Sequence, residues 1–212
     1  DAFLWLDELH CGHINRVLEI SYEPGGKGVN VGCALRSMGH EVLTTGFVGG
    51  NTGRRLEERV REYGLSTNFV YVDGETRTNH IVIDERYGGQ TMVIESGPTV
   101  SRSDLDRLLD QLSRMLTDCR FLVIAGSLPP GMLPSSCLEI LRLAHDRGAR
   151  IVLYLHDGDL DVAIDGEPYL VRVDIRDQDT FMGFETDSLD ERKRLAAMLL
   201  ERTSVVIVGK RF

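Results

Sequence analysis

The sequence predicts an α/β fold in which a mostly parallel sheet is covered by helices on both faces. Apolar runs bounded by turn residues recur as candidate strands, at 42–48, 120–125, 151–155, 169–173 and 204–208. Segments with helical periodicity lie between these runs. Strand and helix therefore alternate, and this alternation favours a parallel sheet.

Two of the predicted helices carry signals at their ends. Leucine and methionine residues between 105 and 116 form one apolar stripe, and Ser101 with Asp104 resembles a capping box ahead of it. A second helix is predicted over 134–147, because Pro134 is tolerated in a first turn and Gly148 is placed to end the helix.

Two regions break the alternation and predict a small separate sheet. The runs 17–22, 79–84 and 91–95 read as strands without helices between them, and residues 87–89 join the last two as a hairpin. A sheet inserted into an α/β domain serves as a lid or a dimer surface, or it is a plain extension of the sheet edge.

Composition restricts the class of partner. The 212 residues carry a formal net charge of −9, which argues against broad binding to nucleic acid or an anionic membrane. Four scattered cysteines with no CxxC spacing predict neither a zinc site nor a disulfide framework, so we expect a reducing cytoplasm. The chain shows no signal peptide or membrane-spanning run, and it begins at Asp1 rather than at a methionine, which hints at a missing upstream segment.

Residues 24–32 form a glycine-rich turn that runs into a predicted helix. Glycines let the backbone approach a ligand closely, and the helix start presents free N–H groups suited to an anion. Lys27 and Asn30 are three residues apart, so both side chains can reach one polyol or phosphate from the same helix face. A simple tight turn is the alternative, and the GxxxxGK[ST] spacing of a P-loop is absent.

Two further segments can contribute polar groups. In the TRTN sequence at 76–79, Arg77 and Asn79 can face one ligand, and a guanidinium suits phosphate; the alternative is a solvated strand end. The GSLPPG sequence at 126–131 follows an apolar strand directly, where loops of a parallel sheet line the ligand crevice. Ser127 can bond a substrate hydroxyl there, unless the loop is only a structural turn.

These motifs, GGKGVN, TRTN and GSLPPG, together with GFVGGNTG at 46–53, have the order and spacing of a known family. The chain resembles the phosphofructokinase B group of ribokinase-like carbohydrate kinases, especially the 1-phosphofructokinase and tagatose-6-phosphate kinase branch. The resemblance implies a three-layer ribokinase-like α/β fold, truncated at both ends, as one partial domain over residues 1–212. Strands from about 3–22 and 68–96 would form its β-clasp lid.

The resemblance also implies a sugar-phosphate site. The residues that would contact the sugar hydroxyls are Asp1, Gly26 and Asn30, with Ser127 orienting the sugar. The cations that would bind the substrate's phosphate are Lys27 and Arg77, with Arg16 as a weaker candidate.

The nucleotide side departs from the family pattern. The family's Gly-Ala-Gly-Asp signature, which supplies the base aspartate, does not occur in the sequence, so no catalytic residue is assigned. Intact members use ATP and Mg²⁺, but here Asp174 and Asp177 replace an asparagine and a glutamate of the magnesium region, and no direct metal ligand is predicted. His156 stands where the family has a small polar turn and is interpreted as a surface histidine.

The leading expectation is an ATP-dependent sugar-phosphate kinase acting on a ketohexose phosphate such as fructose 1-phosphate. The chain would be a fragment or diverged copy that lacks the catalytic-base segment and is inactive as given. The alternative is a non-catalytic sugar-phosphate-binding or regulatory pseudokinase, and a third is an incomplete reading frame whose product does not fold stably. The expected partners are a sugar phosphate and a second copy bound through the lid, with no nucleic acid and no membrane.

Overall fold

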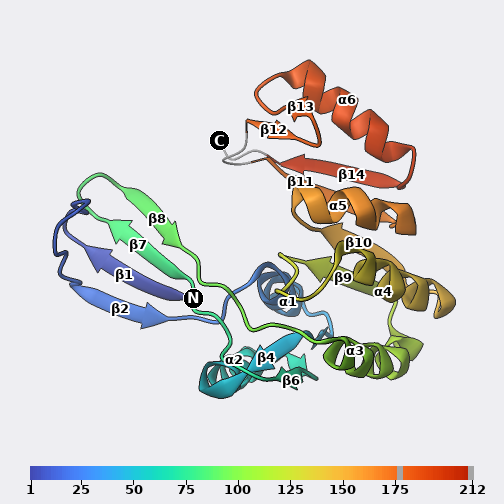
Figure 1. Cartoon of the computed structure of the whole chain (residues 1–212), viewed down its shortest axis with the longest axis horizontal. Coiled ribbons are helices and arrows are strands. Elements are labelled where there is room, and N and C mark those ends of the chain that lie inside the picture. Colours follow the sequence, from blue (N-terminus) through green and yellow to red (C-terminus); the bar gives the residue numbers. More distant parts are fainter. Residues whose placement is uncertain (176–178, 210–212) are drawn as a thin grey trace. The chain divides into compact units, whose positions relative to one another are not determined.

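The computed structural model describes residues 1–175 and 179–209 (Figure 1). The chain divides into two compact units, Asp1–Val100 and Ser101–Phe212. The predicted single domain over 1–212 stays a prediction.

The first unit contains a small sheet of four strands in the order β2 (Glu19–Tyr22), β1 (Ala2–Leu6), β7 (His80–Asp84) and β8 (Gly89–Val93). β1 runs antiparallel to β2 and parallel to β7, and β7 and β8 form an antiparallel hairpin. The predicted separate sheet is therefore present, and β1 falls in the lid range from about 3–22 that the resemblance implies, although the apolar pattern alone does not mark it as a strand. Its sequence AFLWL is apolar throughout and lacks the alternation and turn signals by which the other strands were found.

The predicted strand at 42–48 is two short strands with different partners. β3 (Leu43–Thr44) pairs with β5 (Ser66–Thr67), and β4 (Phe47–Gly49) pairs with β6 (Val70–Val72), both in parallel. Gly46 separates them with a φ of 144°, a conformation that favours glycine. One part of the predicted lid range 68–96, β6, therefore pairs with β4 and not with the small sheet.

Two helices pack beside these short strands. α1 spans Lys27–Ser37 and α2 spans Gly50–Glu62. Their apolar faces meet at a buried cluster of Val29, Val60 and Leu65, with Cys33, Val42 and Leu56 packed against it. Gly32 allows α1 to approach, because a Cβ at this position would lie 2.7 Å from Leu65 Cδ2.

The second unit is built on a parallel sheet in the order β14 (Val205–Gly209), β11 (Leu170–Asp174), β10 (Arg150–Tyr154) and β9 (Phe121–Ala125). All three pairings are parallel, as predicted. α4 (Pro134–Asp146), α5 (Asp157–Ala163) and α6 (Leu189–Leu200) connect successive strands, and the short hairpin of β12 (Thr180–Phe181) and β13 (Phe184–Glu185) precedes α6. The β-branched and leucine side chains of the inner strands form the core, with Leu153, Val171 and Val173 fully buried.

Both predicted helix signals are confirmed. α3 (Arg102–Met115) begins with a capping box in which the Ser101 and Asp104 side chains bond each other's backbone N–H. Pro134 occupies the first turn of α4, and Gly148, with a φ of 72°, follows the end of that helix. None of the helices within 1–175 and 179–209 combines the length and apolar character that a membrane span requires.

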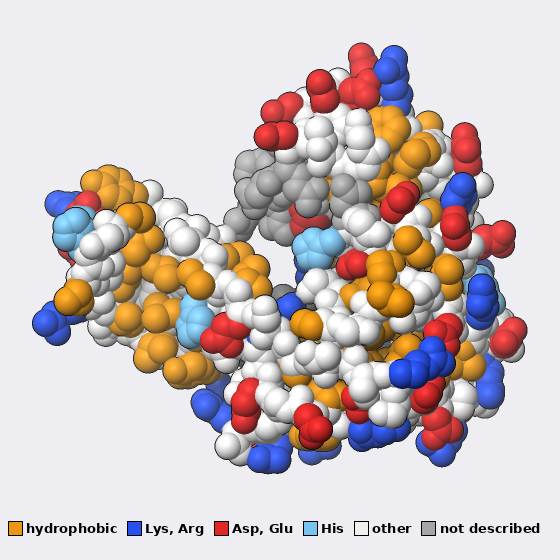
Figure 2. Space-filling view, in the orientation of Figure 1, with side chains coloured by type: hydrophobic (Ala, Val, Ile, Leu, Met, Phe, Trp, Pro, Cys, Tyr) orange, Lys and Arg blue, Asp and Glu red, His pale blue; other side chains and the backbone are white. Residues whose placement is uncertain are grey.

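Hydrophobic side chains gather on the surface of the small sheet (Figure 2). Ile20, Tyr22, Met92 and Val93 are each about half exposed. Contiguous exposed apolar surface marks a place where proteins bind other surfaces. The predicted dimer through these strands stays a prediction.

Candidate functional site

The glycine-rich turn at 46–53 holds the segment 75–79 in place. The Gly49 N–H donates to Thr76 Oγ1 at 2.9 Å, and the Thr76 N–H donates to the Gly49 carbonyl at 3.0 Å. The Glu75 carboxylate caps α2 by accepting the N–H groups of Asn51 (3.1 Å) and Thr52 (2.9 Å). These backbone donors hold the pKa of Glu75 below its ordinary value. The turn at 46–53 therefore fixes the backbone of the segment that carries Arg77 and Asn79.

Asp1 is fixed on its main chain and on its side chain. Its amino group donates to the Glu23 carbonyl at 2.8 Å, and the Glu23 N–H donates back to the Asp1 carbonyl at 3.0 Å. The Asp1 carboxylate accepts a hydrogen bond from Asn79 Nδ2 at 3.0 Å. The start of β1 is thereby tied to the segment that precedes β7.

The Asp1 carboxylate also lies directly against Gly25. A Cβ built on Gly25 would stand 2.2 Å from Asp1 Oδ2 and 2.3 Å from Asp1 Oδ1. Only a residue without a side chain leaves this space for the carboxylate. Two of the predicted site segments, the first residue and the glycine turn, are therefore in contact.

α1 begins where the glycine turn ends. Gly26 is its N-cap with a φ of 106° and offers no capping side chain, so the first backbone N–H groups of the helix receive no side-chain cap. Lys27, half-buried, is the first helical residue, and Asn30, exposed, is one turn further. Gly26, Lys27 and Asn30 therefore share one helix start, as the sequence predicts.

Arg77 lies close in the sequence to a residue that contacts Asp1, whereas Arg16 does not. Arg77 is half-buried and lies two residues before Asn79, the residue that bonds Asp1. Arg16 is exposed in the loop between β1 and β2, at the tip of the small sheet away from the N-terminus (Figure 1). At about 3.3 Å per residue, the five residues of β1 span roughly 16 Å. Within this unit, Arg16 is not brought to Asp1, and its predicted phosphate contact stays a prediction.

In the second unit, Ser127 and Asp174 lie at the carboxyl edge of the parallel sheet. Ser127 is exposed in the loop after β9, which is held to β10 by the Gly126 N–H donating to the Tyr154 carbonyl at 3.0 Å. Asp174 ends β11, and its Oδ2 accepts the Tyr154 hydroxyl at 2.7 Å. The Arg172 guanidinium lies 4.5 Å from the centroid of the Tyr154 ring. Asp174 is therefore part of a Tyr-Asp pair.

The magnesium region that the family implies is not assembled by the described residues. Asp177 lies outside them, and within 1–175 and 179–209 no three His, Cys, Asp or Glu side chains form a group that could hold a metal ion. Asp174 offers one carboxylate, already bonded to a tyrosine, where Mg²⁺ prefers octahedral oxygen ligation. His156, exposed at the N-cap of α5, agrees with its interpretation as a surface histidine.

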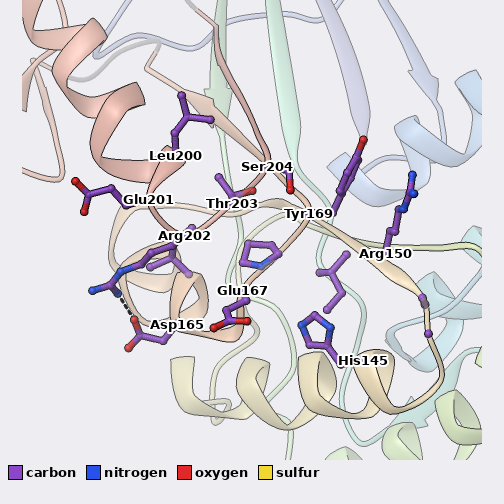
Figure 3. Close-up of a pocket in the computed structure, with 15 residues that line it drawn as sticks. His145, Arg150, Asp165, Glu167, Tyr169, Leu200, Glu201, Arg202, Thr203 and Ser204 are labelled. Atoms are coloured by element: carbon purple, nitrogen blue, oxygen red, sulfur yellow. Dashed lines mark hydrogen bonds and ion pairs between the residues drawn. The ribbon is translucent and has the colours of Figure 1, made fainter.

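A cavity of about 850 Å³ lies at the opposite edge of this sheet, where β10, β11 and β14 begin (Figure 3). Its polar groups bond one another: Arg202 pairs with Asp165, and His145 Nε2 lies 2.8 Å from the Gly166 carbonyl oxygen. The Arg150 guanidinium covers the Tyr169 ring at 4.8 Å. Because ligands of parallel sheets bind at the carboxyl ends of strands, we do not assign this cavity to the predicted site.

Two polar contacts of the site were not predicted. Asn79 was placed on the ligand-facing side of the TRTN segment, but its bond to Asp1 depends on the parallel pairing of β1 with β7. The bond from Tyr154 to Asp174 depends in the same way on the pairing of β10 with β11. The TRTN motif points to Asn79 in the first contact, whereas no sequence signal marks the contact of Tyr154 with Asp174.

The contact between Gly25 and Asp1 predicts the effect of a single added methyl group. Gly25→Ala should displace the Asp1 carboxylate from Asn79, because the new Cβ takes its space, and should cost about 1 kcal/mol for the lost hydrogen bond. Denaturant unfolding measures the cost, and a crystal structure of the variant shows the Asp1 rotamer.

Gly89→Ala in β8 is the matched control, since no atom lies within 4 Å of a Cβ at that position. It should change stability by less than about 0.5 kcal/mol. If Gly25→Ala kept the bond between Asp1 and Asn79 at wild-type stability, the tight contact would be refuted.

Known proteins share both the sequence pattern and the fold of this chain. The model of the pfkB family of carbohydrate kinases matches residues 5–210. A possible 1-phosphofructokinase from Thermotoga maritima is 33% identical, with a TM-score of 0.90 over 99% of this chain and 68% of that chain. The tetrameric inhibited form of phosphofructokinase-2 from Escherichia coli is 23% identical, with a TM-score of 0.87 over 97% of this chain and 69% of that chain.

A further structure of the Escherichia coli phosphofructokinase-2, in complex with fructose-6-phosphate, has a TM-score of 0.84 at 22% identity, over 98% of this chain and 69% of that chain. These two likenesses show a common ribokinase-like fold. The family match over nearly all of the sequence shows more: the chain belongs to the pfkB family of carbohydrate kinases.

Proposed function

We propose that this chain forms the sugar-phosphate side of an ATP-dependent kinase whose substrate is a ketohexose phosphate such as fructose 1-phosphate. The observation that carries the proposal is the Asp1 carboxylate, held between Gly25 and Asn79 beside the start of α1. The possible 1-phosphofructokinase, which is 33% identical, supports the choice of a phosphorylated ketohexose.

The chemistry of the assembled residues suits a phosphorylated polyol. A fixed carboxylate accepts hydrogen bonds from sugar hydroxyls, and the Asn30 amide can both donate and accept them. Lys27 supplies an ammonium group and Arg77 a planar guanidinium, which bind phosphate oxygens through charge-assisted hydrogen bonds. The first N–H groups of α1 add positive potential for the same anion. We assign Gly26 to close backbone approach and Ser127 to a sugar hydroxyl.

The proposed reaction moves one phosphoryl group. A hydroxyl oxygen of the sugar phosphate attacks the γ-phosphorus of ATP, the bond to the ADP oxygen breaks, and the hydroxyl proton passes to a base. In the family this base belongs to a Gly-Ala-Gly-Asp signature, which the 212 residues do not contain. The residues described here would bind and orient the acceptor, and the small sheet would exclude water. We place the activity in the cytoplasm.

The cationic assignment predicts a selective loss of sugar-phosphate affinity. Lys27→Ala and Arg77→Ala should each weaken fructose 1-phosphate binding by about 10- to 100-fold, because each removes a charge-assisted hydrogen bond to phosphate. Isothermal titration calorimetry on the 212-residue chain measures this.

Arg36→Ala, an exposed cation in the last turn of α1, is the charge-matched control and should bind as wild type does. Fructose without phosphate should bind weakly to all four proteins. Unchanged affinity in both site variants would remove the phosphate pocket.

Because the 212 residues lack the signature that supplies the base, we predict that they bind the sugar phosphate without transferring a phosphoryl group to it. With ATP, Mg²⁺ and fructose 1-phosphate, the 212 residues should release no substrate-dependent ADP while still binding the sugar phosphate. A coupled ADP assay at saturating substrate is the measurement. ADP release at a kinase rate of roughly 1–100 per second would show that these residues already contain the base.

A non-catalytic sugar-phosphate-binding protein is the alternative, and one contact favours it. Asp174, which stands where the family has an amide, is bonded to the buried Tyr154 hydroxyl. A second assay on the complete gene product distinguishes the two. If that product also gave no ADP with any ketohexose phosphate, the kinase proposal would fall and the binding role would remain.

A further inference from the structure

We propose that Asn79 is a positioning residue, which holds the Asp1 carboxylate in the orientation that receives the sugar hydroxyls. This inference rests on the proposed function, because the orientation of the Asp1 carboxylate affects activity only if a sugar hydroxyl binds to it. It concerns a residue to which the motif comparison gave no role of its own.

The backbone fixes Asn79 beside Asp1 before any side chain acts. The Ala2 N–H donates to the Asn79 carbonyl at 2.7 Å, at the start of the parallel pairing of β1 with β7. The Asn79 side chain then completes the link through Nδ2, 3.0 Å from Asp1 Oδ1. With Glu23 bonding the Asp1 main chain and Gly25 leaving room for the carboxylate, Asp1 is constrained by two segments, 23–25 and the residue Asn79.

The other half of the Asn79 amide adds no hydrogen bond to this arrangement among the described residues. Asn79 Oδ1 is buried and accepts no hydrogen bond within the described part of the chain. A buried acceptor without a partner lowers stability, and an apolar side chain of similar size would avoid this cost. Exchanging the amide oxygen and nitrogen would place a carbonyl against a carboxylate, so the orientation with Nδ2 toward Asp1 is the favourable one.

The polar groups on either side of Asn79 contact Glu95 and not Asp1. The Thr78 N–H donates to Glu95 Oε2 at 2.9 Å, and His80 Nε2 lies 3.2 Å from Glu95 Oε1. Glu95 therefore anchors the segment on both sides of Asn79. The Asn79 side chain is left to hold Asp1.

The test replaces the amide by an apolar isostere. Asn79→Leu removes both the donor to Asp1 and the unpaired acceptor, so we expect unfolding stability to stay equal or rise while the Kd for fructose 1-phosphate increases about 10-fold. A merely structural asparagine would give the opposite result, reduced stability with unchanged Kd, and would overturn the proposal. Asn79→Asp, with its second carboxylate beside Asp1, should bind more weakly still.

Gln111→Leu in α3 is the matched control, because Gln111 Oε1 is likewise buried without a partner among the described residues. It should hold or gain stability and leave the Kd unchanged. An increase of the Kd in this variant equal to that in Asn79→Leu would also overturn the proposal, since the effect would then not require contact with Asp1.

A double-mutant cycle with Asp1→Asn separates positioning from direct contact. If Asn79 acts through Asp1, adding Asn79→Leu to Asp1→Asn should change the Kd by less than twofold. If the double variant instead multiplied the separate effects of the two substitutions on the Kd, Asn79 would act independently of Asp1 and the inference would be refuted.

A wild-type chain that bound no sugar phosphate would refute the proposed function, and the positioning claim would still be decided by NMR. Asp1→Asn should shift the Asn79 side-chain amide resonances, identified by their absence in Asn79→Leu. Unshifted resonances would refute the bond itself.

Discussion

The parallel pairing of β1 with β7 is the interaction on which the proposed sugar-phosphate site depends. It sets Ala2 opposite His80 and so brings the first residue of the chain next to the TRTN segment. The contact with Asn79 follows from this register, whereas the contacts with Glu23 and Gly25 follow from the antiparallel pairing of β1 with β2. The carboxylate reaches Asn79 because the strands start together, and it reaches Gly25 because Glu23 pairs with the Asp1 backbone. A shift of register by one residue would turn every side chain of β1 to the other face and separate these groups.

The second unit gathers its polar groups by a different constraint. All four strands of its sheet are parallel, so the loops after β9, β10 and β11 leave the same edge. Ser127, His156 and Asp174 are placed there by topology, whereas the cavity at the other edge contains the ion pair of Arg202 with Asp165. The predicted polar residues therefore lie at the carboxyl ends of the strands, where ligands of parallel sheets bind, and not at the cavity.

The sequence predicted most where a local signal agreed with the final contact. The capping box of α3 and the strands of the parallel sheet were found because their patterns are complete within a few residues. The helix start that carries Gly26, Lys27 and Asn30 was found for the same reason. What failed was non-local or featureless. The apolar pattern alone does not mark β1, which only the family resemblance places in the lid range. The break at Gly46 depends on a single backbone conformation, and the bonds from Asn79 and Tyr154 exist only through strand pairing.

The family resemblance adds what local patterns lack, because it assigns Asp1 and Arg77 to one site, and the structure bonds Asp1 to Asn79, two residues after Arg77. Arg16 lies in the loop between β1 and β2, and its predicted phosphate contact stays a prediction. We infer that Asp1, the start of α1 and the segment before β7 form one sugar-phosphate site. Amide chemical-shift mapping of the ¹⁵N-labelled chain with fructose 1-phosphate tests this most directly. The shifts should concentrate at 25–30 and 76–79. Shifts confined to other residues, or no shifts at saturating ligand, would show that these segments do not form the site.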